Sequence, residues 1–363
     1  MEQIILDRRA LHRIPELDKD TPKTLAYLQN SLSGLKCKVF SPCQSALCAY
    51  FDFGADSAVA FRSDTDALPL MEDNDTDYVS THPGKMHACG HDGHMAILLE
   101  LARRLDKLQS CKNNVLLVFQ PAEESGGGAK DICETGVFTE YNARAIFGLH
   151  VWAGMEKGSL WSCPGPMMIR SSSMKIDVYG QSVHVSEAYL GKDAMAAGME
   201  IHRRIMALDH RLPPETKRLI KIGKFHSGTV GNAVAEYTEI RGTLRAYEDD
   251  LYFSLGEQIY AICKHVEEET GCTVEVDIGE GYPAVWNPED LYEQVCKLAP
   301  IRYMPKPSMG AEDFSWYQRY LPGLFIFMGV GEDVPAAHST DFDFDDSVLI
   351  HGADYFQTLA EQF

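Results

Sequence analysis

Three short apolar runs, each followed at once by polar residues, constrain the fold of this chain more than any other feature. The runs are 58–62, 114–119 and 145–149, and they lead to Asp64 and Asp66, to Glu123 and Glu124, and to His150. A helical apolar pattern at 95–105 separates the first two runs. Buried strands that alternate with helices predict an α/β domain with a largely parallel sheet. Ligands gather beyond the carboxyl ends of such strands, so the polar groups are expected to share one site.

The pattern changes after about residue 174. Strands are expected at 174–179, 218–225, 233–246 and 272–278, with helices at 193–207 and 249–269. This β-α-β-β-α-β order is the ferredoxin-like arrangement. A chain of 363 residues favours two domains. We expect a discontinuous metal-binding domain, 1–168 with 279–363, and an inserted domain, 169–278, because His338 must return to the first domain to join the site.

Composition excludes several classes of function. The formal net charge of −20 argues against nucleic acid or an anionic membrane as partner. No apolar run is long enough for a membrane span, and the first residues do not resemble a signal peptide. Ten cysteines without framework spacing are expected to be reduced, which favours the cytoplasm.

The segment 87–94, HACGHDGH, combines ligand types that bind borderline-soft divalent metals. Cys89 and His91 are the strongest ligand candidates in it. His94 is open to two interpretations, a ligand or a residue that orients one. Asp92 is expected to cap the following helix rather than to bind metal.

The adjacent Glu123 and Glu124 suit metal-dependent hydrolysis. Neighbouring side chains in an irregular turn point apart, so one carboxylate can bind metal while the other takes a proton from water. His150 and His338 are further ligand candidates. Asp64 and Asp66 fit either a solvated turn or the site.

Five motifs in order resemble the aminoacylase/carboxypeptidase family of metal-dependent amidohydrolases. They are RSDTDALP at 62–69, MHACGHDGH at 86–94, FQPAEE at 119–124, GLHVW at 148–152 and GAEDFS at 310–315. The most similar branch holds hippurate hydrolases, indole-acetyl-amino-acid hydrolases and N-acetyldiaminopimelate deacetylases. The resemblance implies an α/β fold: a mixed-sheet, zinc-peptidase-like catalytic domain with an inserted ferredoxin-like α+β lid that forms a homodimer.

The same resemblance implies roles for individual residues. It implies two divalent metal ions, zinc, manganese, cobalt or nickel, and it makes Glu123 the general base and acid. In the lid it implies that His184 contacts the substrate carbonyl and that Asn232 and Arg245 line the substrate pocket. The implied metal ligands are Cys89, His91, Glu124, His150 and His338, with Asp66 as a supporting carboxylate behind them.

The expected activity is hydrolysis of the amide bond of small N-acyl amino acids, with an acetyl or aromatic acyl group. N-acetyldiaminopimelate deacetylation and dipeptide hydrolysis are alternatives, as is a catalytically silent binding protein on the same fold. One departure affects substrate choice: the branch usually has a second lid histidine where this chain has Tyr189.

Overall fold

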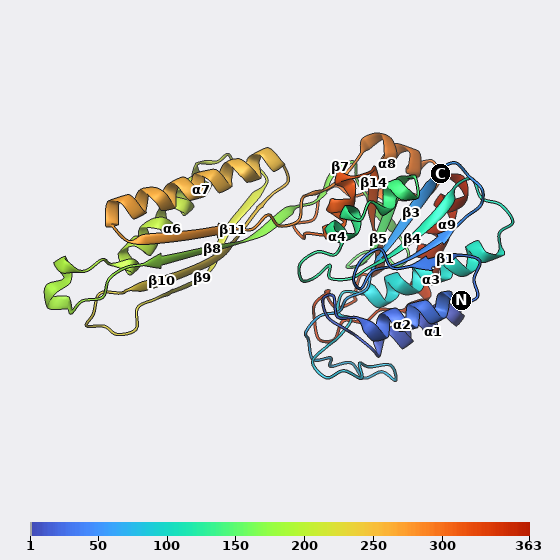
Figure 1. The fold of residues 1–363 in the computed structure, drawn as a ribbon, viewed down its shortest axis with the longest axis horizontal. Coiled ribbons are helices and arrows are strands. Elements are labelled where there is room, and N and C mark those ends of the chain that lie inside the picture. The colour runs from blue at the N-terminus through green and yellow to red at the C-terminus, as the bar shows by residue number, and fades with distance from the viewer. Residues whose placement is uncertain (1) are drawn as a thin grey trace. The chain divides into compact units, whose positions relative to one another are not determined.

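The computed structural model describes residues 2–363 and divides into two units (Figure 1). Unit 1 holds the residues up to 167 together with 285–307 and 312–363. Unit 2 holds 168–284 and the short segment 308–311. Unit 1 is therefore built from segments on both sides of unit 2 in the sequence.

Unit 1 is built on an eight-stranded mixed sheet with the order β1-β2-β4-β3-β5-β14-β6-β13. The strands are β1 (Lys38–Phe40), β2 (Leu47–Phe51), β3 (Ala58–Asp64), β4 (Asn114–Gln120), β5 (Ala143–Ala153), β6 (Leu160–Ser162), β13 (Ile301–Tyr303) and β14 (Gly323–Gly331). The central strands β4, β3, β5 and β14 are parallel, whereas β1, β2 and β6 add antiparallel pairs. A separate two-stranded sheet joins β7 (Gly165–Met168) to β12 (Val285–Asn287). The expected α/β fold with a mixed sheet is confirmed.

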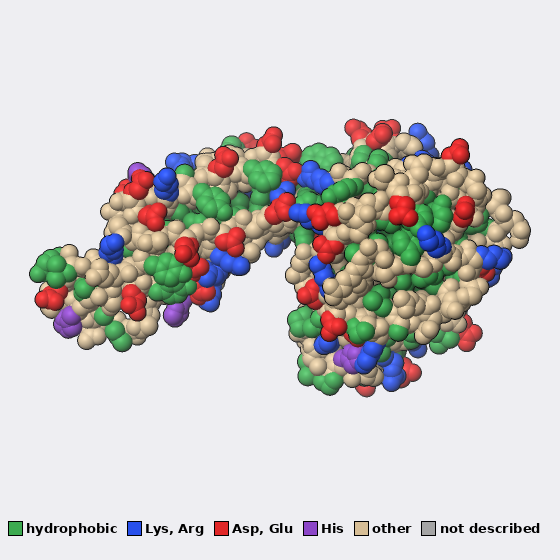
Figure 2. Space-filling model, in the orientation of Figure 1, with side chains coloured by type: hydrophobic (Ala, Val, Ile, Leu, Met, Phe, Trp, Pro, Cys, Tyr) green, Lys and Arg blue, Asp and Glu red, His purple; other side chains and the backbone are tan. Residues whose placement is uncertain are grey.

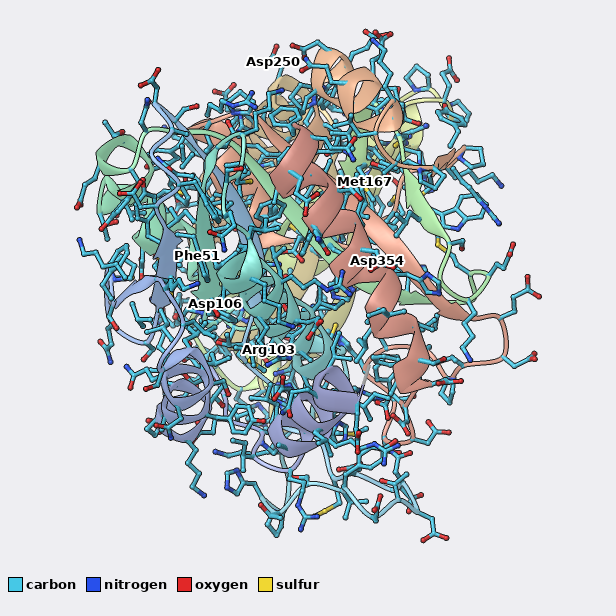
Figure 3. All side chains as sticks on the ribbon, turned by 90° about the vertical axis from the view of Figure 1, so that its right-hand side faces the viewer. Phe51, Arg103, Asp106, Met167, Asp250 and Asp354 are labelled. Carbon is cyan, nitrogen blue, oxygen red and sulfur yellow. The ribbon has the colours of Figure 1, made fainter. Side chains whose placement is uncertain are left out.

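Helices cover the sheet of unit 1. They are α1 (Glu2–His12), α2 (Pro22–Leu32), α3 (His91–Lys107), α4 (Ala129–Glu134), α5 (Val137–Glu140), α8 (Glu289–Cys296), α9 (Leu349–Gln362) and the 3₁₀ helices η2 (Asp313–Arg319) and η3 (Asp346–Val348). The ring of Phe61 in β3 packs against that of Phe356 in α9, with the ring centroids 5.0 Å apart, so alternate residues of β3 face that helix. Ion pairs Arg103–Asp7 and Arg104–Asp354 tie α3 to α1 and α9; Figure 3 labels Arg103 and Asp354.

Unit 2 is an antiparallel four-stranded sheet, β11-β8-β10-β9, with two helices packed on it (Figure 1). Its elements are β8 (Arg170–Tyr179), the 3₁₀ helix η1 (Val185–Leu190), α6 (Ala194–Arg211), β9 (Arg218–Ser227), β10 (Tyr237–Ala246), α7 (Asp249–Thr270) and β11 (Thr273–Ile278). Met174, Ile176 and Val178 alternate along β8 and are buried against the helices. Among residues 2–363, no helix combines the length and the apolar character that a membrane span requires.

Candidate metal centre

The polar residues predicted from strand ends meet at one edge of the unit 1 sheet. Asp64 ends β3 and pairs in register with Gln120, which ends β4, and Arg62 pairs with Gly148 of β5. Glu123 follows β4 by three residues, and His150 lies in the last part of β5. The parallel arrangement of these three strands therefore gathers side chains that are up to 86 positions apart in the sequence (Asp64 to His150).

Cys89 and His91 are presented by the turn that begins α3. Gly90 between them is the N-cap and adopts φ +87°, a left-handed conformation that favours glycine. A Cβ on Gly90 would lie 2.3 Å from Cγ2 of Val151, so space also requires glycine here. Cys89 and His91 are both buried. The turn thus holds a thiol and an imidazole at the start of the helix, beside strand β5.

Two histidine rings have their Nδ1 atoms tied to backbone carbonyls. His91 Nδ1 lies 2.8 Å from the carbonyl oxygen of Asp66, and His150 Nδ1 lies 2.6 Å from that of Val151. A carbonyl can only accept, so each Nδ1 carries a hydrogen and each Nε2 faces the site. His91 Nε2 is buried and makes no hydrogen bond within the described chain. A backbone carbonyl on Nδ1 is the usual support of a metal-ligating histidine.

The five predicted ligands converge. One ligand atom from each of Cys89, His91 and Glu124 lies within 4.8 Å of the other two. Cys89 Sγ is 3.4 Å from His150 Nε2, and Glu124 Oε1 is 3.1 Å from Nε2 of the half-exposed His338. Thiol, imidazole and carboxylate together make a donor set that fits borderline divalent metals.

Asp66 holds the turn that carries the two glutamates. Its Oδ1 accepts the backbone N–H of Glu123 and its Oδ2 accepts that of Glu124, both at 3.0 Å. Ala122, just before them, adopts φ +60°, which is strained for a residue with a Cβ. The carboxylate of Asp66 therefore fixes a sharp turn.

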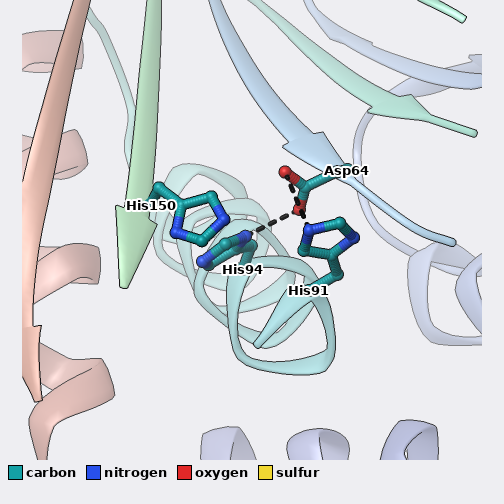
Figure 4. Close-up of side chains that lie close together, drawn as sticks. All are labelled: Asp64, His91, His94 and His150. Atoms are coloured by element: carbon teal, nitrogen blue, oxygen red, sulfur yellow. Dashed lines mark hydrogen bonds and ion pairs between the residues drawn. The ribbon is translucent and has the colours of Figure 1, made fainter. Parts of the chain in front are cut away.

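His94 and Asp64 form a pair beside these ligands (Figure 4). His94 Nδ1 lies 2.6 Å from Asp64 Oδ1, and His94 Nε2 accepts the backbone N–H of Val151 at 2.9 Å. Both ring nitrogens are thus used within the protein, which favours the interpretation of His94 as a residue that orients its neighbours. Asp64 also lies 3.7 Å from Nε2 of His91 through its other oxygen.

The expectation that Asp92 caps α3 is wrong. Gly90 is the N-cap, and Asp92 lies inside the first turn, where it is completely buried. Its Oδ2 accepts from Arg8 Nε at 3.2 Å and lies 2.8 Å from His12 Nδ1. The carboxylate of Asp92 therefore binds the buried cations of α1 instead of capping α3.

Glu123 lies next to two acidic residues that the motif pattern alone did not assign. Carboxylate oxygens of Glu123, Glu312 and Asp313 lie within 4.8 Å of one another, and all three residues are buried. Arg62 supplies the cation at this cluster: its Nη2 donates to Glu312 at 2.9 Å and to Asp313 at 3.0 Å. The cluster is therefore held by a guanidinium and is a poor candidate for a further metal.

Burial and crowding of charge shift the ionisation of the site. Burial, with the charges of Glu312 and Glu124, holds the pKa of Glu123 well above its ordinary value. Burial likewise raises the pKa of the Cys89 thiol, with the help of Glu124. Burial lowers the pKa of His91, but Asp64 and Asp66 outweigh it and raise that pKa to about 10. A divalent cation would displace the protons of the thiol and the imidazole, so the charge of the site fits a metal.

The predicted lid residues all lie in unit 2. Exposed His184 precedes η1, and the backbone carbonyl of Asn232 accepts the N–H of Val185 at 3.2 Å, so these segments adjoin. Arg245 is near the other end of β10, where it pairs with Ser171 and donates to the carbonyl of Met309. Within unit 2, the structure does not bring Arg245 to His184.

Comparisons with known proteins agree on one family. The model of peptidase family M20/M25/M40 matches residues 60–362. An uncharacterized hydrolase of Staphylococcus haemolyticus is 31% identical over 373 residues, which cover 99% of this chain and 97% of that protein. An uncharacterized hydrolase of Staphylococcus epidermidis is 30% identical over 377 residues, with 100% and 98% covered.

A solved structure of similar sequence points the same way. The YXEP protein of Bacillus subtilis, a dinuclear metal binding peptidase from the M20 family, is 26% identical with a TM-score of 0.86. The match covers 99% of this chain and 97% of that one.

Proposed function

This chain belongs to peptidase family M20/M25/M40, and we propose that it hydrolyses the amide bond of N-acyl amino acids to a carboxylate and a free amino acid. The observation that carries the proposal is the pair of histidines, His91 and His150, whose Nδ1 atoms are tied to carbonyls and whose Nε2 atoms face Cys89 and Glu124. We assign Cys89, His91, Glu124, His150 and His338 as ligands of two divalent metal ions.

Glu123 and Glu124 have different roles in the proposed reaction. Bound divalent metals would supply the Lewis acidity that polarises the acyl carbonyl and lowers the pKa of water. Glu124, on the ligand side of the turn, holds metal. Glu123, whose pKa lies above its ordinary value, takes a proton from the attacking water and passes it to the leaving amine. Asp66 keeps the two carboxylates in place through their backbone N–H groups.

Unit 2 supplies the remaining roles in this proposal. His184 donates a hydrogen bond to the carbonyl oxygen as negative charge develops on it. Asn232 and Arg245 bind the substrate. A cysteine ligand needs a reduced thiol, which supports the cytoplasm as the location.

The experiment is a substrate panel. Purified protein is supplied in turn with zinc, manganese, cobalt and nickel, and is offered N-acetyl and N-benzoyl amino acids, N-acetyldiaminopimelate and dipeptides. We expect the N-acyl amino acids to be hydrolysed fastest, and only with metal present. Faster turnover of the dipeptides or of N-acetyldiaminopimelate would replace the proposed substrate, and full activity in verified metal-free protein would contradict the mechanism.

We also propose that unit 2 forms a homodimer. β9 is an edge strand, and an edge invites pairing. Beside it lies a cavity of about 910 Å³ lined by residues of α6 and β9, including exposed Met199 and Phe225. Light scattering should give twice the chain mass of 40.5 kDa. Phe225→Asp should give monomer, whereas Phe253→Asp on exposed α7 should not; a monomeric wild type with full activity contradicts the proposal.

A further inference from the structure

The segment that carries His184 is held at a fixed place in unit 2. Val234 N–H donates to the carbonyl of Val183 at 2.9 Å, and His184 pairs as an isolated antiparallel bridge with Ala233. The carbonyl of His184 accepts the N–H of Glu187 at 2.9 Å, within the first turn of η1. The backbone of this exposed histidine is therefore ordered by the neighbouring segment 233–234 and by η1.

The ring of His184 caps η1, and Ser186 supplies both hydrogen-bond partners of its Nδ1 atom. The backbone N–H of Ser186 donates to His184 Nδ1 at 3.3 Å, and Ser186 Oγ lies 2.8 Å from the same nitrogen. A backbone N–H can only donate, so Nδ1 must be an acceptor here, and the serine hydroxyl is then the donor in the second contact. A neutral imidazole with a bare Nδ1 carries its hydrogen on Nε2.

We infer that Ser186 is a positioning residue that fixes His184 in the Nε2–H tautomer. The inference rests on the proposed function, in which His184 faces the developing oxyanion. An oxyanion needs a donor. With Nδ1 occupied by Ser186, the ring presents Nε2–H to the substrate; the other tautomer would present a lone pair and repel the oxyanion. Figure 2 shows hydrophobic, acidic and histidine colouring at the surface of the end of unit 2 that carries η1.

The kinetic test compares three serine variants. Ser186→Ala keeps the backbone donor and loses the hydroxyl, so kcat for the panel's best N-acyl amino acid should fall about 2- to 10-fold, the scale of one neutral hydrogen bond, with KM unchanged. Ser186→Thr keeps a hydroxyl and should restore kcat. Ser254→Ala makes the same change on exposed α7 and should leave kcat as it is. Unchanged kcat in Ser186→Ala overturns the inference.

The second readout does not depend on activity. Long-range ¹⁵N–¹H spectra of histidine-labelled protein distinguish a protonated ring nitrogen from a bare one, and His184→Ala identifies the His184 signals by their loss. We expect Nδ1 bare and Nε2 protonated in the wild type, and a tautomer mixture in Ser186→Ala. A protonated Nδ1 in the wild type, or identical spectra for both proteins, overturns the inference. Absence of amide hydrolysis in the wild type would instead refute the proposed function, while the spectra still decide the tautomer.

Discussion

Arg62 donates a hydrogen bond from Nη1 to Oδ2 of Asp64 across 2.7 Å, and both side chains are fully buried. The same guanidinium reaches Glu312 and Asp313, which are 250 and 251 positions away. Asp64 in turn binds His94, which contacts the backbone of β5. One arginine therefore connects the surroundings of the proposed base to the strand that carries His150.

Loss of this arginine should destabilise unit 1. Arg62→Met leaves buried carboxylates without their cation, and breaking a buried pair costs about 3–5 kcal/mol. Arg302 pairs with Glu156 at the surface, with 46% and 60% of the side chains exposed, so Arg302→Met should leave the free energy of unfolding nearly unchanged. Denaturant unfolding measures the free energy of unfolding of both variants. Equal losses in Arg62→Met and Arg302→Met would contradict the role of Arg62.

Glu123 and Glu124 should respond differently to the same substitution. Glu123→Gln should keep its metal and lose about 10²–10⁴-fold in kcat, because a proton acceptor is removed. Glu124→Gln should lose metal, because a ligand is weakened. Metal content by mass spectrometry and kcat at saturating metal separate the two; the reverse result for metal content would show that the assignment is wrong.

Cys89 should be protected from alkylation by metal. A metal-bound thiolate is shielded, so labelling should be slow in the metal-loaded protein and faster after chelation, when the sulfur is released from the metal. Burial raises the pKa of the free thiol, so the rate after chelation should still stay below that of an exposed cysteine. Half-buried Cys37 lies outside the cluster and serves as the reference thiol, with equal labelling in both states. Peptide mass spectrometry follows both, and identical kinetics for Cys89 with and without metal would count against ligation.

His12 should make stability depend on pH. Burial lowers its pKa, but Asp92 and Glu72 outweigh burial and raise it to about 9. Since this lies above the unfolded value of about 6.5, the stabilisation is complete below pH 6.5 and is lost as pH rises through 9, up to about 3 kcal/mol.

The measurement is the free energy of unfolding of metal-loaded wild type and His12→Gln at each pH. The difference between them should shrink from pH 6 to pH 10. His210→Gln, at an exposed position of α6, is the matched control. A difference that stays constant over this range would rule out the titration of His12.

The parts of the site that follow directly from strand ends could be predicted from the sequence. The runs at 58–62, 114–119 and 145–149 became β3, β4 and β5, and parallel pairing alone brings their ends together. Whether Asp64 belongs to a solvated turn or to the site, and whether His94 binds metal, could not be decided that way. Both answers depend on partners that only the folded chain supplies, the ring of His94 and the N–H of Val151.

Other parts of the fold and the site could not be predicted, because the sequence around them carries little distinctive pattern. β14 is a nearly uniform buried run, which periodicity cannot assign to a strand, and it was not predicted. The GAEDFS motif marked the segment of Glu312 and Asp313, but its chemistry depends on Arg62. The inserted domain was predicted to end at 278, whereas unit 2 continues to Ala284 and includes 308–311. The pairing of Arg62 with Glu312 and Asp313 joins residues 250 and 251 positions apart, and such a pairing cannot be predicted from the sequence.

The position of β14 in the sheet has a consequence for biosynthesis. β14 lies between β5 and β6, although unit 2 and part of unit 1 separate it from them in the sequence. During translation the sheet of unit 1 stays open at its middle until β14 leaves the ribosome. All of unit 2, 168–284 with 308–311, precedes β14 in the sequence and has been made by then. His338 follows β14 in the sequence, so the nascent chain acquires its full set of proposed ligands only after β14 has been made.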